Sequence, residues 1–266
     1  MIEYIEQYNP LLIAFLLGVF TWLFTALGAS LVFLTRKINQ IFLDGMLGIA
    51  GGVMIAASYF SLLAPAIEIN QANNNPNTIK IAIGFIAGAL FLFVLDKILP
   101  HLHLYQKEVQ PEGIKTAWQK ATLLTLAITL HNIPEGLSMG ILLGGASLGI
   151  PEATINGALS LAIGLGIHNF PEGIIVALPL RKIGLSPKKS FLYGQASALV
   201  EPIASVIGVL FISFFTPILP YALAFAAGAM IFVVIEEIIP LTRLNKNTDI
   251  ANIGFILGFA LMMCLN

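Results

Sequence analysis

Charged residues are scarce in this chain of 266 residues: only 10% are Asp, Glu, Lys or Arg, while 58% are hydrophobic. Soluble domains usually carry about a quarter of charged residues, enough to cover one core with a polar surface. Too few charges exist here for such a surface, which excludes a soluble protein. The composition therefore predicts an integral membrane protein.

Cysteine and runs of basic residues are also lacking. Cys264 is the one cysteine, which excludes a disulfide framework and any metal site built from several thiolates. The 13 Lys and Arg nearly balance the 14 Asp and Glu without forming a basic run, so no nucleic-acid partner is predicted. The first ten residues contain Glu3 and Glu6 and lack the positive start of a signal peptide, so the first apolar stretch is expected to be retained.

Eight apolar stretches of roughly 20 residues are long enough to cross about 30 Å of hydrocarbon. Charged or Asn- and Pro-rich breaks separate them. The predicted spans are 11–34, 41–67, 79–100, 118–145, 155–180, 190–214, 217–240 and 250–265. The expected fold class is all-α, a polytopic membrane bundle of eight transmembrane helices that forms a single domain over residues 1–266.

Basic residues collect at the connections on one side of this predicted bundle, and that side is expected to be cytoplasmic. They are Arg36, Lys37, Lys97, Lys107, Lys115, Lys120, Arg181, Lys182, Lys188, Lys189, Arg243 and Lys246. The opposite side, with both termini, receives only Lys80. Both termini are therefore predicted to lie outside.

Two copies of one hexapeptide lie in the middle of neighbouring predicted spans. His131–Gly136 reads H-N-I-P-E-G in the fourth span, and His168–Gly173 reads H-N-F-P-E-G in the fifth, 37 residues later. Ionisable residues cost on the order of 2.5–3.5 kcal/mol each at the centre of a membrane helix. Their retention in two near-identical motifs indicates a function.

Residues four apart share one face of a helix, so His131 lies with Glu135 and His168 lies with Glu172. The two spans cross in opposite directions, and facing helices can bring the four groups together. Imidazole and carboxylate suit Zn²⁺ and Fe²⁺, while the lack of thiolates argues against Cu(I). These four residues are predicted to form one metal site.

A third buried carboxylate lies at a similar depth. Glu201 is followed by a proline near the centre of the sixth span, and each hexapeptide also contains a proline, which tends to kink a helix. Irregular backbone of this kind is tolerated where it lines a cavity. Asn132 and Asn169 are expected to turn amide oxygens toward Glu201, forming a second metal position that shares Glu172.

Acidic and histidine residues at the inner ends of two spans are candidate accessory ligands at a metal exit, with ordinary solvated side chains as the alternative. They are Glu236, Glu237, Asp96, His101 and His103. Glycines in the second and third spans, such as Gly48 and Gly88, are expected to allow close helix approach.

A histidine beside an asparagine can also form a hydrogen-bond clamp between membrane helices. That explanation suits one hexapeptide alone better than two copies together with Glu201. Three uncompensated carboxylates would cost roughly 8–10 kcal/mol, comparable to the stability of a whole domain. A site that binds cations is therefore favoured over a clamp or a purely structural scaffold.

The paired H-N-x-P-E-G motifs, followed by Glu201 and Pro202 in the next span, resemble the ZIP (Zrt/Irt-like protein) family of divalent metal-ion transporters, particularly its prokaryotic branches. The resemblance covers nearly the whole chain, including L-D-K-I-L-P-H-L-H at the end of the third span and G-A-M-I-F-V-V-I-E-E-I-I-P in the seventh. It implies a 3+2+3 arrangement of helices with inverted outer repeats, and a homodimer.

The resemblance also implies a binuclear site at mid-membrane. The first metal would be held by His131, Glu135, His168 and Glu172, and the second by Asn132, Asn169, Glu172 and Glu201. Ser61 and Glu237 would border the first metal. Some members carry Gln in place of His168 or Asp in place of Asn169, which leaves the preferred metal and the filling of the second position open.

We therefore expect a transporter of the cell membrane, and no enzyme, that moves divalent cations into the cytoplasm. Zn²⁺ is the first expected substrate, followed by Fe²⁺, Mn²⁺ and Cd²⁺, with no prosthetic group; metal ions and lipid are the expected partners. One alternative is a proton or organic-cation carrier that uses the same carboxylates. Another is an intramembrane metalloenzyme, although the spacing of His and Glu and the intervening proline differ from the H-E-x-x-H motif.

Overall fold

The computed structural model describes residues 9–35, 39–73, 78–99, 120–243 and 248–266, and within these ranges it contains helices and no strands. Eight helical segments are long and apolar enough to cross a membrane, which confirms the predicted all-α bundle. They are Pro10–Phe33, Gln40–Ala72, Ile79–Ile98, Ala121–Ser147, Ile155–Lys182, Pro187–Phe214, Thr216–Thr242 and Thr248–Leu265.

Four spans are single helices, and the other four consist of shorter pieces in sequence. The single helices are α5 (Ile79–Ile98), α6 (Lys120–Ser147), α7 (Ile155–Lys182) and α12 (Thr248–Leu265). The first and second spans contain α2 (Pro10–Ser30), η1 (Leu31–Phe33), α3 (Gln40–Ala57), η2 (Ser58–Leu63) and α4 (Ala64–Ala72). The sixth and seventh contain α8 (Pro187–Ala196), α9 (Val200–Phe214), η3 (Thr216–Ile218), α10 (Leu219–Val233), η4 (Val234–Ile238) and α11 (Ile239–Thr242).

Polar capping residues mark where several of these helices begin. The side chain of Asn9 accepts a hydrogen bond from the backbone N–H of Leu11, and Pro10 occupies the first helical position of α2. Thr154 and Ser186 cap α7 and α8 in the same way. Several apolar stretches therefore start as a helix at the polar residue that precedes them.

The irregular backbone lies mainly outside the two hexapeptide helices. Both α6 and α7 stay helical through their prolines, Pro134 and Pro171. A turn at residues 197–199 divides the sixth span directly before α9, and the segments η2 and η4 are π-helical. Single π-helical turns inside longer helices are frequent at functional sites. The second and seventh spans are therefore the ones whose regular hydrogen bonding is altered.

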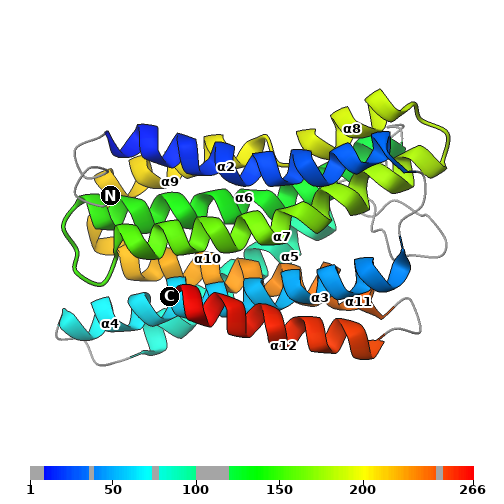
Figure 1. Ribbon diagram of the computed structural model, residues 1–266. Helices are drawn as coiled ribbons and strands as arrows, with labels where there is room; N and C mark the ends of the chain where they lie inside the picture. Colours follow the sequence, from blue (N-terminus) through cyan, green and yellow to red (C-terminus); the bar gives the residue numbers. More distant parts are fainter. Residues whose placement is uncertain (1–8, 36–38, 74–77, 100–119, 244–247) are drawn as a thin grey trace.

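The helices α6 and α7 form the centre of the bundle (Figure 1). The most extensive helix contacts join α2 to α7, α6 to α9, α3 to α12 and α5 to α10. In the most apolar 18 residues of each span, 78% of α6 and 83% of α7 are buried, against 22% for α5 and α12. The hexapeptides thus lie on the inner helices, while the outer helices turn apolar side chains such as Ile83 and Ile256 outward, where a bilayer would cover them.

Small residues allow the outer helices to pack closely, as predicted for Gly48 and Gly88. A Cβ atom on Gly48 would lie 2.1 Å from the backbone oxygen of Ala251 in α12. On Gly88 it would lie 1.9 Å from the backbone oxygen of Phe225 in α10. Neither position can accept a side chain without moving a neighbouring helix.

Replacing Gly48 with Ala is expected to destabilise the protein by about 1–3 kcal/mol, the usual cost of overpacking, because the obstructing atom belongs to backbone. Thermal unfolding in detergent measures this as a lower midpoint. Gly45→Ala is the matched control on the same helix, since the nearest atom to its Cβ is a side-chain methyl of Ile250 at 3.3 Å. Equal midpoints for the two variants would contradict the close packing of α3 on α12.

Candidate metal site

Seven predicted ligands lie in the interior of the bundle, and all are at most 4% exposed. They are His131, Asn132 and Glu135 on α6, His168, Asn169 and Glu172 on α7, and Glu201 on α9. The hexapeptides occupy the middle of α6 and α7, and Glu201 lies in the first turn of α9. Three helices therefore contribute to one buried polar region.

Glu135, His168 and Glu172 come together as a potential metal site. The Nε2 atom of His168 lies 3.2 Å from Oε1 of Glu135 and 3.4 Å from Oε1 of Glu172. One ligand atom from each residue lies within 4.8 Å of the other two. Residues from two facing helices thus converge, and the spacing suits one ion bound by an imidazole and two carboxylates.

The polar atoms in this group form few hydrogen bonds within the protein itself. Both carboxylate oxygens of Glu135, Oε2 of Glu172 and both ring nitrogens of His168 form no hydrogen bond with the described residues. Buried polar atoms usually have partners, because leaving them without one costs free energy. A cation coordinated by these atoms would supply the missing interaction.

His131, the fourth ligand predicted for this position, is buried one turn before Glu135 on α6. It is not one of the three residues whose ligand atoms lie within 4.8 Å of one another. Its role as a ligand therefore stays a prediction.

A second polar group surrounds Glu201. The amide Nδ2 of Asn169 donates to Oε1 of Glu201 at 2.8 Å, which brings these two predicted ligands together. The hydroxyl of Thr21 donates to Oε2 of the same carboxylate. Asn132 is fully buried, and neither of its amide atoms forms a hydrogen bond with the described residues.

Thr21 is the residue of this region that the sequence analysis missed. It lies on α2, the first span, far from the hexapeptides in the sequence. Thr21 and Thr25 are fully buried polar residues spaced four apart in a largely apolar helix. That spacing, which places two hydroxyls on one helix face, was the signal available in the sequence.

The glycine that ends each hexapeptide brings a neighbouring helix against the site. A Cβ on Gly136 would lie 2.7 Å from the backbone oxygen of Glu201, and one on Gly173 would lie 2.0 Å from the backbone oxygen of Thr25. The first contact packs α6 on α9, and the second packs α7 on α2. The motif therefore encodes the packing that surrounds the ligands as well as the ligands themselves.

The accessory residues lie in different parts of the fold. Ser61, in η2, donates its hydroxyl to Oδ1 of Asn266 at 3.0 Å. Glu236 and Glu237 are in η4, and Glu237 is buried. Asp96 is buried near the end of α5. The predicted exit ligands His101 and His103 lie outside the described residues.

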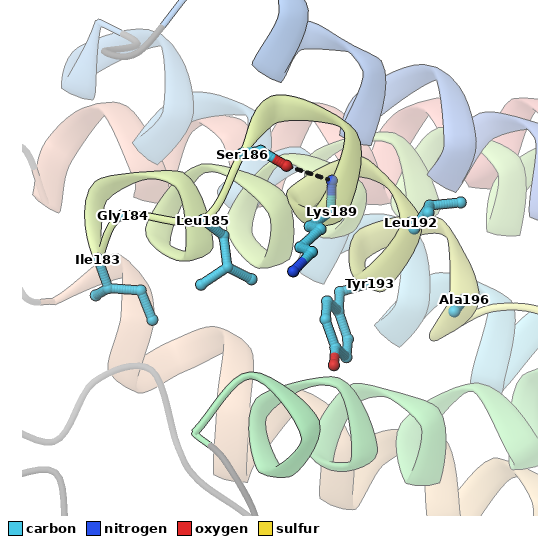
Figure 2. Close-up of a pocket in the computed structure, with 8 residues that line it drawn as sticks. All are labelled: Ile183, Gly184, Leu185, Ser186, Lys189, Leu192, Tyr193 and Ala196. Carbon is cyan, nitrogen blue, oxygen red and sulfur yellow. Dashed lines mark hydrogen bonds between the residues drawn. The ribbon is translucent and has the colours of Figure 1, made fainter.

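A separate pocket of about 690 Å³ opens where α7 connects to α8. Figure 2 shows the side chains of Leu185, Lys189 and Tyr193 around it, and the Ser186 hydroxyl accepting from the Lys189 backbone N–H. None of the residues that line this pocket is a predicted ligand. It therefore contributes no donor to the metal site.

Comparison with known proteins assigns the family. Residues 104–266 match the family model described as ZIP Zinc transporter. The chain is 38% identical to "Zinc transporter ZIP11" of Xenopus tropicalis, over 98% of each protein, and 38% identical to that of Homo sapiens, over 94% of this chain and 96% of the relative. It is also 35% identical to "Zinc transporter GufA" of Myxococcus xanthus, over 91% of this chain and 93% of the relative.

The chain belongs to the ZIP zinc transporter family. This confirms the family inferred from the paired hexapeptides, including its bacterial branches. It also favours the predicted transporter over an intramembrane metalloenzyme, because the ZIP family consists of transporters.

Replacing His168 with Ala is expected to weaken Zn²⁺ binding by more than about a hundredfold, because removal of a direct ligand should exceed the 10–100-fold cost of losing an outer partner. Equilibrium dialysis of the detergent-solubilised protein measures the dissociation constant. Glu152→Gln, in the connection between α6 and α7, removes a carboxylate outside the site and should bind like the wild type. Unchanged Zn²⁺ affinity in a folded His168→Ala variant would exclude His168 as a ligand.

Proposed function

We propose that this ZIP-family protein transports divalent metal ions, Zn²⁺ first among them, across the cell membrane into the cytoplasm. The proposal rests on one observation: Glu135, His168 and Glu172 are buried inside a bundle of eight helices, and one ligand atom from each lies within 4.8 Å of the other two. Mixed nitrogen and oxygen ligands suit Zn²⁺ and also accept Fe²⁺, Mn²⁺ and Cd²⁺. The relatives named as zinc transporters support Zn²⁺ as the main substrate.

The first metal position would consist of Glu135, His168 and Glu172, with His131 as the predicted fourth ligand. A transported ion would exchange its water for these groups at the middle of the bundle. Conduction requires binding that is strong enough to admit the ion and weak enough to release it. Two carboxylates and one or two imidazoles provide such a site without the thiolates of a closed structural zinc site.

A second position would be formed by Asn132, Asn169 and Glu201, with Glu172 shared between the two ions. Support comes from the contact of Asn169 with Glu201 and from the buried amide atoms of Asn132. The protein would then hold a binuclear site during transport. Ions leaving it would pass toward Glu236, Glu237 and Asp96 at the inner ends of the spans.

The proposed orientation places both termini outside and the connections rich in Lys and Arg in the cytoplasm, following the distribution of basic residues. A homodimer in the bilayer is proposed from the family resemblance. The proposed direction of transport is inward, by passive or gradient-driven uptake.

Glu135→Ala combined with Glu172→Ala is expected to reduce ⁶⁵Zn²⁺ uptake into proteoliposomes to the level of protein-free liposomes, because both carboxylates of the first position are lost. Glu152→Gln, reconstituted in the same way, should transport like the wild type. Size-exclusion chromatography and thermal unfolding establish that each variant is folded. Unchanged uptake by the folded double variant would refute the metal pathway, and uptake of protons or an organic cation without competition from Cd²⁺ would favour the alternative carrier.

The orientation is testable with single cysteines in a Cys264→Ala background. Gln71→Cys, at the predicted outer end of the second span, should react in intact cells with a maleimide that does not cross membranes, and Lys188→Cys should react only after lysis. Both positions are exposed in the structure, so accessibility to water is matched. The reverse labelling pattern would place the termini in the cytoplasm.

A further inference from the structure

The first span contacts both ligands proposed for the second metal position through one residue. The hydroxyl of Thr21 donates to Oε2 of Glu201, and the backbone oxygen of Thr21 accepts from Nδ2 of Asn169 at 3.3 Å. Asn169 and Glu201 are themselves joined at 2.8 Å. Three helices, α2, α7 and α9, therefore meet in one hydrogen-bonded triangle.

We propose that Thr21 is a positioning residue that orients Glu201 and Asn169 for the second metal ion. The inference rests on the proposed function, because it requires these two residues to be ligands. Thr21 contacts the ion through neither of its oxygens in this scheme. Its two hydrogen bonds instead hold a carboxylate and an amide in the rotamers that metal binding needs.

The triangle leaves specific atoms available to an ion. The Nδ2 atom of Asn169 is held by Thr21 and Glu201, while Oδ1 of Asn169 is buried and forms no hydrogen bond with the described residues. An amide offers its oxygen as the metal ligand, so the atom needed for coordination is the one left without a partner. A carboxylate has about four acceptor positions, so Glu201 can keep the Thr21 hydroxyl and still bind an ion.

The fold holds Thr21 at this place through close packing of α2 on α9. A Cβ on Gly18, one turn before Thr21, would lie 2.4 Å from Cα of Pro202. The Thr21 hydroxyl also lies 3.0 Å from the backbone oxygen of Gly18, its alternative acceptor. A hydroxyl has one hydrogen, and a carboxylate attracts it more strongly than a peptide oxygen does. Glu201 is therefore the favoured partner.

Thr25 provides a matched comparison on the same helix. It is fully buried one turn after Thr21, and its hydroxyl forms no hydrogen bond with the described residues. Both threonines can be replaced by Val, which keeps the branched shape and removes the hydroxyl. The two Val variants thus differ in whether a hydrogen bond to a proposed ligand is lost.

The test measures the number of Zn²⁺ ions bound and their affinities, by equilibrium dialysis of ⁶⁵Zn²⁺ with the full-length protein in detergent. Thr21→Val should weaken the second position by roughly 10–100-fold, the effect of losing an outer-shell partner, and leave the first position unchanged. Thr21→Ser keeps the hydroxyl and should restore the second position. Thr25→Val should match the wild type at both positions.

Glu201→Gln separates this inference from the function on which it rests. If the wild type binds a single ion, or if Glu201→Gln keeps both, the proposed second position is refuted. If Glu201→Gln loses the second ion but Thr21→Val binds both with wild-type affinity, the positioning role of Thr21 is overturned. It is also overturned if Thr21→Val weakens both positions equally, if Thr25→Val has the same effect, or if Thr21→Ser fails to restore binding.

Discussion

Burial of negative charge in the middle of a membrane bundle is the constraint on which the rest of this structure depends. Glu135, Glu172 and Glu201 are at most 2% exposed, and a carboxylate at that depth requires compensation. The protein provides it in two ways. Glu201 receives hydrogen bonds from a hydroxyl and an amide, whereas Glu135 has the imidazole of His168 near its Oε1 atom and no hydrogen bond to the described residues. Glu135 is therefore the carboxylate whose charge a bound cation would compensate.

Close helix packing makes this arrangement possible. The hexapeptide glycines Gly136 and Gly173 let α9 and α2 approach the site closely. Outer pairs such as α3 and α12 use glycines in the same way. In a bilayer, where lipid is as apolar as the side chains, such van der Waals contact is a main source of helix association.

Backbone irregularity is distributed differently from the expectation. The sequence drew attention to the prolines of α6 and α7, yet both helices continue through them. Instead, π-helical turns occur at η2 and η4, and they contain three of the accessory residues, Ser61, Glu236 and Glu237. No proline or glycine lies inside either segment, but Pro65 and Pro240 follow two residues after them. Neither proline can donate to the carbonyl four residues earlier, that of Ser61 or Glu236. A proline alone does not decide the result, because α6 and α7 stay helical through theirs, so the hydrogen-bond register also depends on what packs against the helix.

The sequence by itself determined that the chain is a membrane protein with eight spans, and it supplied the residue types of the candidate metal site. Low charge content and apolar runs of membrane length leave no other fold class, and residues four apart must share a helix face whatever surrounds them. Only the tertiary structure decided which of those residues meet. It joined Glu135, His168 and Glu172, left His131 outside that group, and brought Thr21 of the first span to Glu201. Helical periodicity fixes directions within one helix, whereas distances between helices follow from the packing of the whole bundle.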